Sequence, residues 1–130
     1  MRLLLDSHLL IGMVRGKWPK VILALETTLA PLQHHDLFVS AASLWEIAIK
    51  SRLGKLDPGM PLDALPDYFL KAGFALLPVD HRHAVAELDP LPSTRDPFDR
   101  LLLAQCAVED LRLVTLDRAL VDHPLAWRAD

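Results

Sequence analysis

Four carboxylates in this sequence stand where a short apolar run ends or where a helical pattern begins, and they are Asp6, Glu46, Asp99 and Asp117. Gathered in one place, these side chains would repel one another unless cations lay between them. Mg²⁺ and Mn²⁺ are hard ions that prefer oxygen ligands. Two such ions about 3.5–4 Å apart can activate water and stabilise the leaving oxygen of a phosphodiester. Metal-assisted phosphodiester hydrolysis is therefore the leading chemical hypothesis.

Most of these acids also have a purely structural interpretation. Asp6 and Asp117 each follow an apolar run and could cap a following helix. In RDPFDRLLLAQCAVED, residues 95–110, we expect Asp96 to be the helix N-cap. Asp99, three residues later, suits the positive end of the same helix. Local rules alone therefore leave helix capping and metal binding both open.

Glu46 is harder to explain as a structural residue. A pair with Lys50, four residues on, would contribute only a few tenths of a kcal/mol. The surrounding VSAASLWEIAI is apolar nearly all round, which predicts a buried helix with Glu46 as its one acid. Because an unpaired buried carboxylate is costly, we expect this side chain to need a metal ion.

The position of these acids depends on the predicted strands and helices, and the chain alternates short apolar runs with helical patterns. Strands are predicted at 2–5, 37–39, 74–79 and 111–116, with a short closing strand at 125–127; helices are predicted at 7–14, 19–29, 41–53, 62–72, 81–87 and 97–109. The runs are continuous rather than alternating, which is typical of strands covered on both faces. Such alternation predicts a parallel sheet with helices on both faces. Ligands then bind beyond the carboxyl ends of the strands, where these acids lie.

Length and composition narrow the class of protein. The 130 residues predict one domain over 1–130, and no apolar run is long enough for a membrane span, so we expect a cytoplasmic protein. The single cysteine excludes an internal disulfide and a thiolate zinc cluster. A net charge of −3 argues against a general nucleic-acid binder, although it leaves room for an enzyme with a local basic patch.

Four blocks carry a resemblance to a known family. LLLDSHLLIG, VSAASLWEIAIKSRLGKL, RDPFDRLLLAQCAVED and LRLVTLD, in this order, resemble PIN-domain proteins, and among them the VapC-type toxins of bacterial toxin–antitoxin modules. The resemblance implies a three-layer α/β/α PIN-like fold with a central parallel sheet of four to five strands. It also implies Mg²⁺- or Mn²⁺-dependent endoribonuclease activity and inhibition by a cognate antitoxin.

The same resemblance assigns roles to individual residues. Asp6 and Asp99 are the expected direct metal ligands. Glu46 and Asp117 are expected to complete the site or to orient water, and the hydroxyl of Ser7 to assist. One departure is the Ser-Thr pair at 93–94, in a loop where relatives often carry histidines.

Basic and apolar residues point to partners. We expect RNA phosphates to contact a basic set made of Lys50, Arg52, Arg100 and Arg118. Apolar segments suggest a homodimer, or a groove for an antitoxin helix. The three tryptophans at 18, 45 and 127 are expected to be core or interface anchors rather than base-stacking platforms.

Two other function classes remain beside the nuclease. The first is a catalytically silent PIN-like module that binds protein or RNA and whose acids are caps; the intact Glu46 argues against it. The second is a phosphatase or receiver-like phosphoacceptor. A dehalogenase-type phosphatase would carry D-x-D after the first strand, where this chain has Asp6-Ser7-His8. His81 and His83 are two residues apart on a predicted helix, point apart, and are not expected to share a metal.

Overall fold

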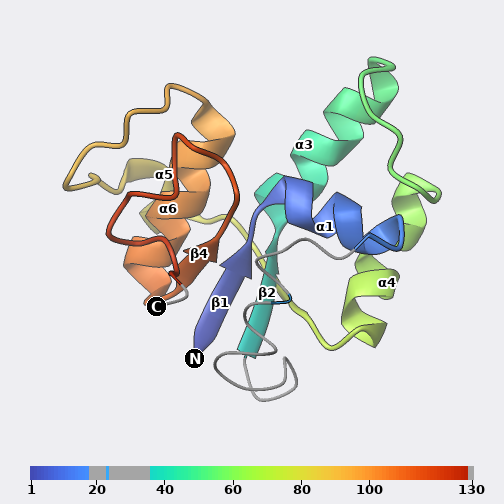
Figure 1. Ribbon diagram of the computed structural model, residues 1–130, viewed down its shortest axis with the longest axis horizontal. Helices are drawn as coiled ribbons and strands as arrows, with labels where there is room; N and C mark the ends of the chain where they lie inside the picture. The colour runs from blue at the N-terminus through green and yellow to red at the C-terminus, as the bar shows by residue number, and fades with distance from the viewer. Residues whose placement is uncertain (18–22, 24–35, 129–130) are drawn as a thin grey trace.

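The computed structural model describes residues 1–17, 23 and 36–128 (Figure 1). Its sheet has four strands: β1 (Arg2–Leu5), β2 (Asp36–Ser40), β3 (Ala75–Leu77) and β4 (Arg112–Val114). Their order is β3-β2-β1-β4, and every neighbouring pair is parallel. All the carboxyl ends therefore lie along one edge of the sheet. The helix predicted at 19–29 lies outside the described residues except for Leu23, and so does Trp18.

The helices follow the strands much as the sequence pattern predicts. They are α1 (Ser7–Val14), α3 (Ala41–Arg52), α4 (Leu65–Lys71), α5 (His81–Val85) and α6 (Pro97–Glu109), with a 3₁₀ turn η3 (Leu62–Ala64) leading into α4. Gly54 and Gly73 follow α3 and α4 with φ of +72° and +98°. These left-handed positions at helix ends suit glycine, which has no Cβ to clash.

Two apolar cores lie on opposite faces of the sheet. Leu3 and Leu5 of β1 pack in one core with residues of α1, α3 and α4. Leu4, between them in sequence, packs in the other core with residues of α6. Successive strand side chains point to opposite faces, so β1 contributes to both. Figure 1 shows α1 and α4 on one side of the strands and α5 and α6 on the other. The predicted α/β/α fold with a parallel sheet is confirmed.

Some predicted bounds are wrong in detail, and the strand predicted at 111–116 is only Arg112–Val114. The strand predicted at 74–79 is reduced to Ala75–Leu77, an edge strand with Leu76 36% exposed, so it is not covered on both faces. Pro78 follows it and has no N–H to extend the ladder. The strand predicted at 125–127 is a single bridge between Leu113 and Ala126.

Trp45, expected to be a core or interface anchor, is 61% exposed and is therefore not a core residue. Its ring meets Phe98 of α6 edge to face, with centroids 5.8 Å apart. Trp127, in contrast, is partly buried against the core that contains Leu3 and Leu5. None of the described helices is long and apolar enough to cross a membrane.

Candidate functional site

Asp6 lies at the carboxyl end of β1 and begins the site. It is the N-cap of α1, where the Leu9 N–H donates to its Oδ1 at 3.2 Å. The Thr115 hydroxyl donates a hydrogen bond to its Oδ2. The residue is only 4% exposed, and burial raises the pKa of this carboxyl above its usual value. Asp6 is thus both a cap and a buried acid at the sheet edge.

Asp117 is joined to Asp6 through Thr115, which follows β4. The Thr115 hydroxyl donates to Asp6 and accepts the Asp117 N–H at 3.0 Å. The Asp117 carboxylate accepts the Ala119 N–H at 2.9 Å. Because β1 and β4 are neighbouring parallel strands, this one hydroxyl connects Asp6, which follows β1, with Asp117, which follows β4. This threonine stands two residues before Asp117 in the LRLVTLD block, and no role was predicted for it.

Glu46 is buried, as predicted, but it is not unpaired. The buried Ser7 hydroxyl donates to Oε1 at 2.6 Å, and the Lys50 ammonium donates to Oε2 at 2.7 Å. The expectation that Glu46 needs a metal for charge compensation is therefore wrong, because the pair with Lys50 does form. It is stronger than a surface pair would be, since Glu46 is 6% exposed. Glu46 alone does not distinguish an enzyme from a silent module.

The two aspartates around Pro97 have different surroundings, and the prediction that Asp96 is the helix cap is confirmed. Asp96 is the N-cap of α6, accepting the Phe98 N–H at 2.8 Å. Among the described residues, Asp99 accepts a hydrogen bond from the Thr94 hydroxyl alone, at 3.1 Å. Partial burial first, and then the charges of Asp96, Asp117 and Glu46, together raise the pKa of Asp99 to about 6 against the opposing Thr94 hydrogen bond. The negative charge of Asp99 is therefore poorly compensated.

The four predicted acids are connected by hydrogen bonds and by electrostatic interactions, but they do not form one compact group of ligand atoms. Among the described residues, the group of three or more His, Cys, Asp or Glu side chains whose ligand atoms lie within 4.8 Å of one another is a different one, made of Asp80, His83 and Glu109. Asp6 and the Asp117 N–H are both hydrogen-bonded to the Thr115 hydroxyl. The charges of Asp117 and Glu46 contribute to the raised pKa of Asp99. Mg²⁺ typically takes one or two carboxylates and keeps several waters. An all-oxygen set of mutually repelling donors at one edge of the sheet suits such an ion.

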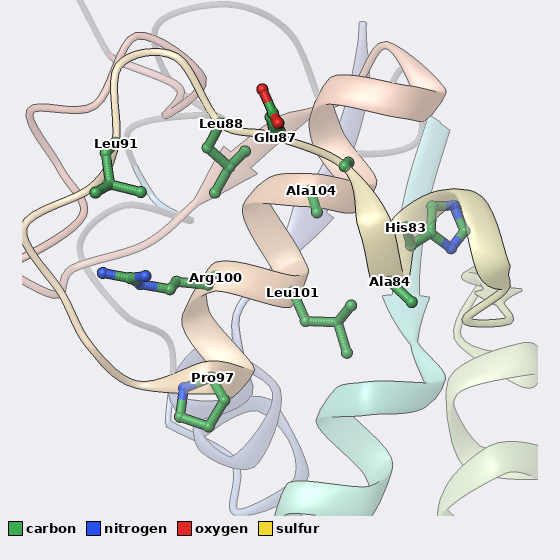
Figure 2. A pocket seen from close by; sticks show the side chains of 10 residues that line it. His83, Ala84, Glu87, Leu88, Leu91, Pro97, Arg100, Leu101 and Ala104 are labelled. Atoms are coloured by element: carbon green, nitrogen blue, oxygen red, sulfur yellow. The ribbon is translucent and has the colours of Figure 1, made fainter.

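The four residues predicted to contact RNA phosphates have different surroundings in the structure. Lys50 pairs with Glu46, and Glu46, Asp96 and Asp99 all raise its pKa. Arg100 instead donates from Nε to the Thr94 carbonyl at 2.8 Å and borders a cavity of about 720 Å³ between α5, the following loop and α6 (Figure 2). Arg52 and Arg118 are exposed, at the end of α3 and beside Asp117. Lys50 alone among them has an ion pair within the acid cluster.

A second titratable cluster, which sequence analysis missed, consists of Asp80, His83 and Glu109. The Asp80 N–H donates to His83 Nδ1 at 2.9 Å, so Nε2 carries the proton and faces Glu109 Oε1 at 3.1 Å. The Arg82 guanidinium donates to Asp80 Oδ2 at 2.8 Å and to Glu109 Oε1 at 2.6 Å. Hydrogen bonding to Arg82 lowers the pKa of Asp80 to about 2.

This cluster does not fit a metal site. Both nitrogens of His83 are engaged, and the guanidinium of Arg82 already occupies the position of a cation between the two carboxylates. It is a structural anchor of α5 on α6. His81 is exposed while His83 is buried, which confirms that these two histidines point apart. The capping-box spacing of Asp80 and His83 was the available signal.

Known proteins resemble this chain at the level of family and fold. The PIN domain family model matches residues 3–124. Ribonuclease VapC16 of Mycobacterium tuberculosis (strain ATCC 25618 / H37Rv) is 48% identical over 50 residues, which are 38% of this chain and 36% of that protein. The match thus spans about a third of the curated relative.

A solved structure extends the fold comparison over nearly the whole chain. It is the crystal structure of VapBC2 from Rickettsia felis bound to a DNA fragment from their promoter, which superposes with a TM-score of 0.65. The comparison covers 98% of this chain and 100% of that chain at 15% sequence identity. At this identity the likeness establishes a shared fold.

Proposed function

This chain belongs to the PIN-domain family, and on that premise we propose that it is a Mg²⁺- or Mn²⁺-dependent endoribonuclease, the toxin of a type II toxin–antitoxin module. The similarity to Ribonuclease VapC16 over 50 residues supports the activity. We propose that the whole of residues 1–130 forms a single PIN domain that acts in the cytoplasm.

The observation that carries this proposal is the electrostatic position of Asp99. Its carboxylate is partly buried, lies within electrostatic reach of Asp96, Asp117 and Glu46, and among the described residues accepts a hydrogen bond from one hydroxyl. A helix cap would not need this arrangement, because Asp96 already caps α6. An acid whose pKa is raised by burial and by like charges is typical of a functional site.

Each acid of the cluster receives a role in this proposal. Asp6 and Asp99 would hold the ion, and Glu46 and Asp117 would complete its surroundings and orient water. Bound there, Mg²⁺ or Mn²⁺ would act as a Lewis acid on the phosphodiester. Thr115 would keep Asp6 and Asp117 in position, and Ser7 would hold Glu46.

Partners complete the proposal. Lys50, Arg52, Arg100 and Arg118 are the side chains we assign to RNA phosphates. A cognate antitoxin would block the acidic edge, and the toxin would act as a homodimer. Expression of the chain alone should then arrest bacterial growth, and coexpression of its antitoxin, sought first in the adjacent gene, should restore growth.

The direct test is cleavage of total RNA by purified, antitoxin-free protein in Mg²⁺, in Mn²⁺ and in EDTA. We expect discrete fragments with either ion and none in EDTA, with activity restored by added metal. Mapping the fragment ends would then identify the RNA target. Cleavage that persists in EDTA, or intact RNA under all three conditions, would contradict the proposal and favour a silent PIN-like binding module.

A further inference from the structure

Lys50 lies in the acid cluster without being an acid or a predicted metal ligand. Its ammonium is 2.7 Å from Glu46 Oε2, and its side chain is 37% exposed against 8% for Glu46. The other oxygen of Glu46 is held by the buried hydroxyl of Ser7. Both oxygens of this carboxylate are therefore engaged in the absence of any metal.

The charge of Lys50 acts beyond this one pair. Asp96 and Asp99 of α6 also raise the pKa of Lys50, after the larger contribution of Glu46 on its own helix. Its ammonium therefore lies within electrostatic reach of the acid that we assign as a metal ligand. Two cations that share one set of carboxylates disfavour each other by Coulomb repulsion.

We propose that Lys50 is the resident counter-cation of the acid cluster: its ammonium neutralises Glu46 when no divalent ion is present and lowers the affinity of the cluster for Mg²⁺ or Mn²⁺. In this role Lys50 acts through Glu46. This inference rests on the proposed metal site and adds a competition that the proposed function does not require.

The test is calorimetric titration of metal-free protein with Mn²⁺ alone, without RNA. Lys50→Met should bind Mn²⁺ about five-fold or more tighter than wild type, because coupling between two such sites is typically of this size or larger. Lys50→Arg keeps the charge and should bind like wild type. If circular dichroism shows that Lys50→Met is unfolded, Lys50→Gln, which retains a donor for Glu46 without the charge, decides the question.

A matched control comes from the chain itself. Lys71 forms another i,i+4 pair, with Asp67 on α4, at 3.9 Å and with both side chains largely exposed. Lys71→Met removes the same charge and the same kind of pair at a different place, so its Mn²⁺ affinity should equal that of wild type. Equal tightening by both variants would mean that overall charge is responsible, which would overturn the proposal.

A double-mutant cycle with Glu46→Gln locates the competition. When Glu46 carries no charge, removal of Lys50 should change Mn²⁺ affinity much less than it does in wild type. Unchanged or weaker binding by Lys50→Met would refute the role of Lys50 while leaving the metal site intact. Absence of Mn²⁺ binding by wild type would instead overturn the proposed metal site itself, so the two failures are distinguishable.

Discussion

The hydroxyl of Thr115 donates a hydrogen bond to the carboxylate of Asp6, joining the carboxyl ends of two neighbouring parallel strands. The same oxygen accepts the backbone N–H of Asp117. Thr115 therefore organises two acids at once, although it carries no charge and binds no metal in our account. The geometry of the site depends on such neutral donors as much as on its carboxylates.

The first prediction concerns this hydroxyl. Thr115→Val keeps the shape of the side chain but leaves Oδ2 of the buried Asp6 carboxylate without its donor, which we expect to destabilise the protein by about 1–3 kcal/mol. Thr115→Ser should restore most of that loss. Urea unfolding of the three metal-free proteins measures the effect, and equal stability of wild type and Thr115→Val would contradict the assigned hydrogen bond.

The second prediction concerns the charge on Asp99. Its pKa is raised from 3.8 to about 6 in the folded protein. A raised carboxyl pKa means that the ionised form disfavours folding, so the penalty is full above about pH 6 and disappears as the pH falls towards 3.8. Because the side chain is partly exposed, screening reduces the penalty to roughly 1 kcal/mol.

Asp99→Asn should therefore stabilise the metal-free protein at pH 7.5 and have a much smaller effect at pH 4. Urea unfolding in EDTA at the two pH values measures this difference. The same variant should lose metal-dependent cleavage, so stability and activity would change in opposite directions. A variant that is less stable than wild type at pH 7.5 would show that Asp99 serves the fold.

The third prediction concerns the helix cap. Asp96→Ala removes the acceptor for the Phe98 N–H and should cost about 1 kcal/mol of stability. Asp96→Asn should retain the cap, because asparagine is an equally good N-cap residue. Thermal unfolding of both variants provides the comparison. If both lose the same stability, the charge of Asp96, rather than its capping bond, is what α6 requires.

The fourth prediction concerns the anchor of α5 on α6. His83→Ala removes a buried ring that accepts from the Asp80 N–H and contacts Glu109, and we expect a loss of roughly 1–3 kcal/mol. Mn²⁺ affinity should stay at the wild-type value, since this cluster is not the metal site. Thermal unfolding and calorimetry measure the two quantities, and weakened Mn²⁺ binding would show that the anchor belongs to the metal-binding machinery.

Sequence reasoning predicted the frame well wherever local chemistry decides it. The helix beginning at Pro97 follows from Asp96 as the cap and from the apolar run behind it, and the structure has the same bounds. The strand at Leu76 is shorter than predicted, because an apolar run does not reveal that a strand lies at the edge of a sheet.

The site was harder to predict than the frame. Its acids follow parallel strands or begin helices, so topology alone brings them to one edge. The hydrogen-bond partners of the acids could not be predicted in this way. Ser7 contacts Glu46, 39 residues away in the sequence, and His83 contacts Glu109, 26 residues away. Such contacts depend on tertiary packing. The pair of Glu46 with Lys50 was visible as i,i+4 spacing and was undervalued, because burial strengthens it.

The measurement that tests the central claim most directly is the RNA cleavage rate of Asp99→Asn beside that of Asp96→Asn, both at saturating Mn²⁺. The two variants remove the same charge three residues apart and keep similar side chains. We expect Asp96→Asn to cleave RNA in a metal-dependent way and Asp99→Asn to be slower by roughly 100-fold or more. Equal rates for the two variants would contradict the account and return Asp99 to the role of a helix-start residue.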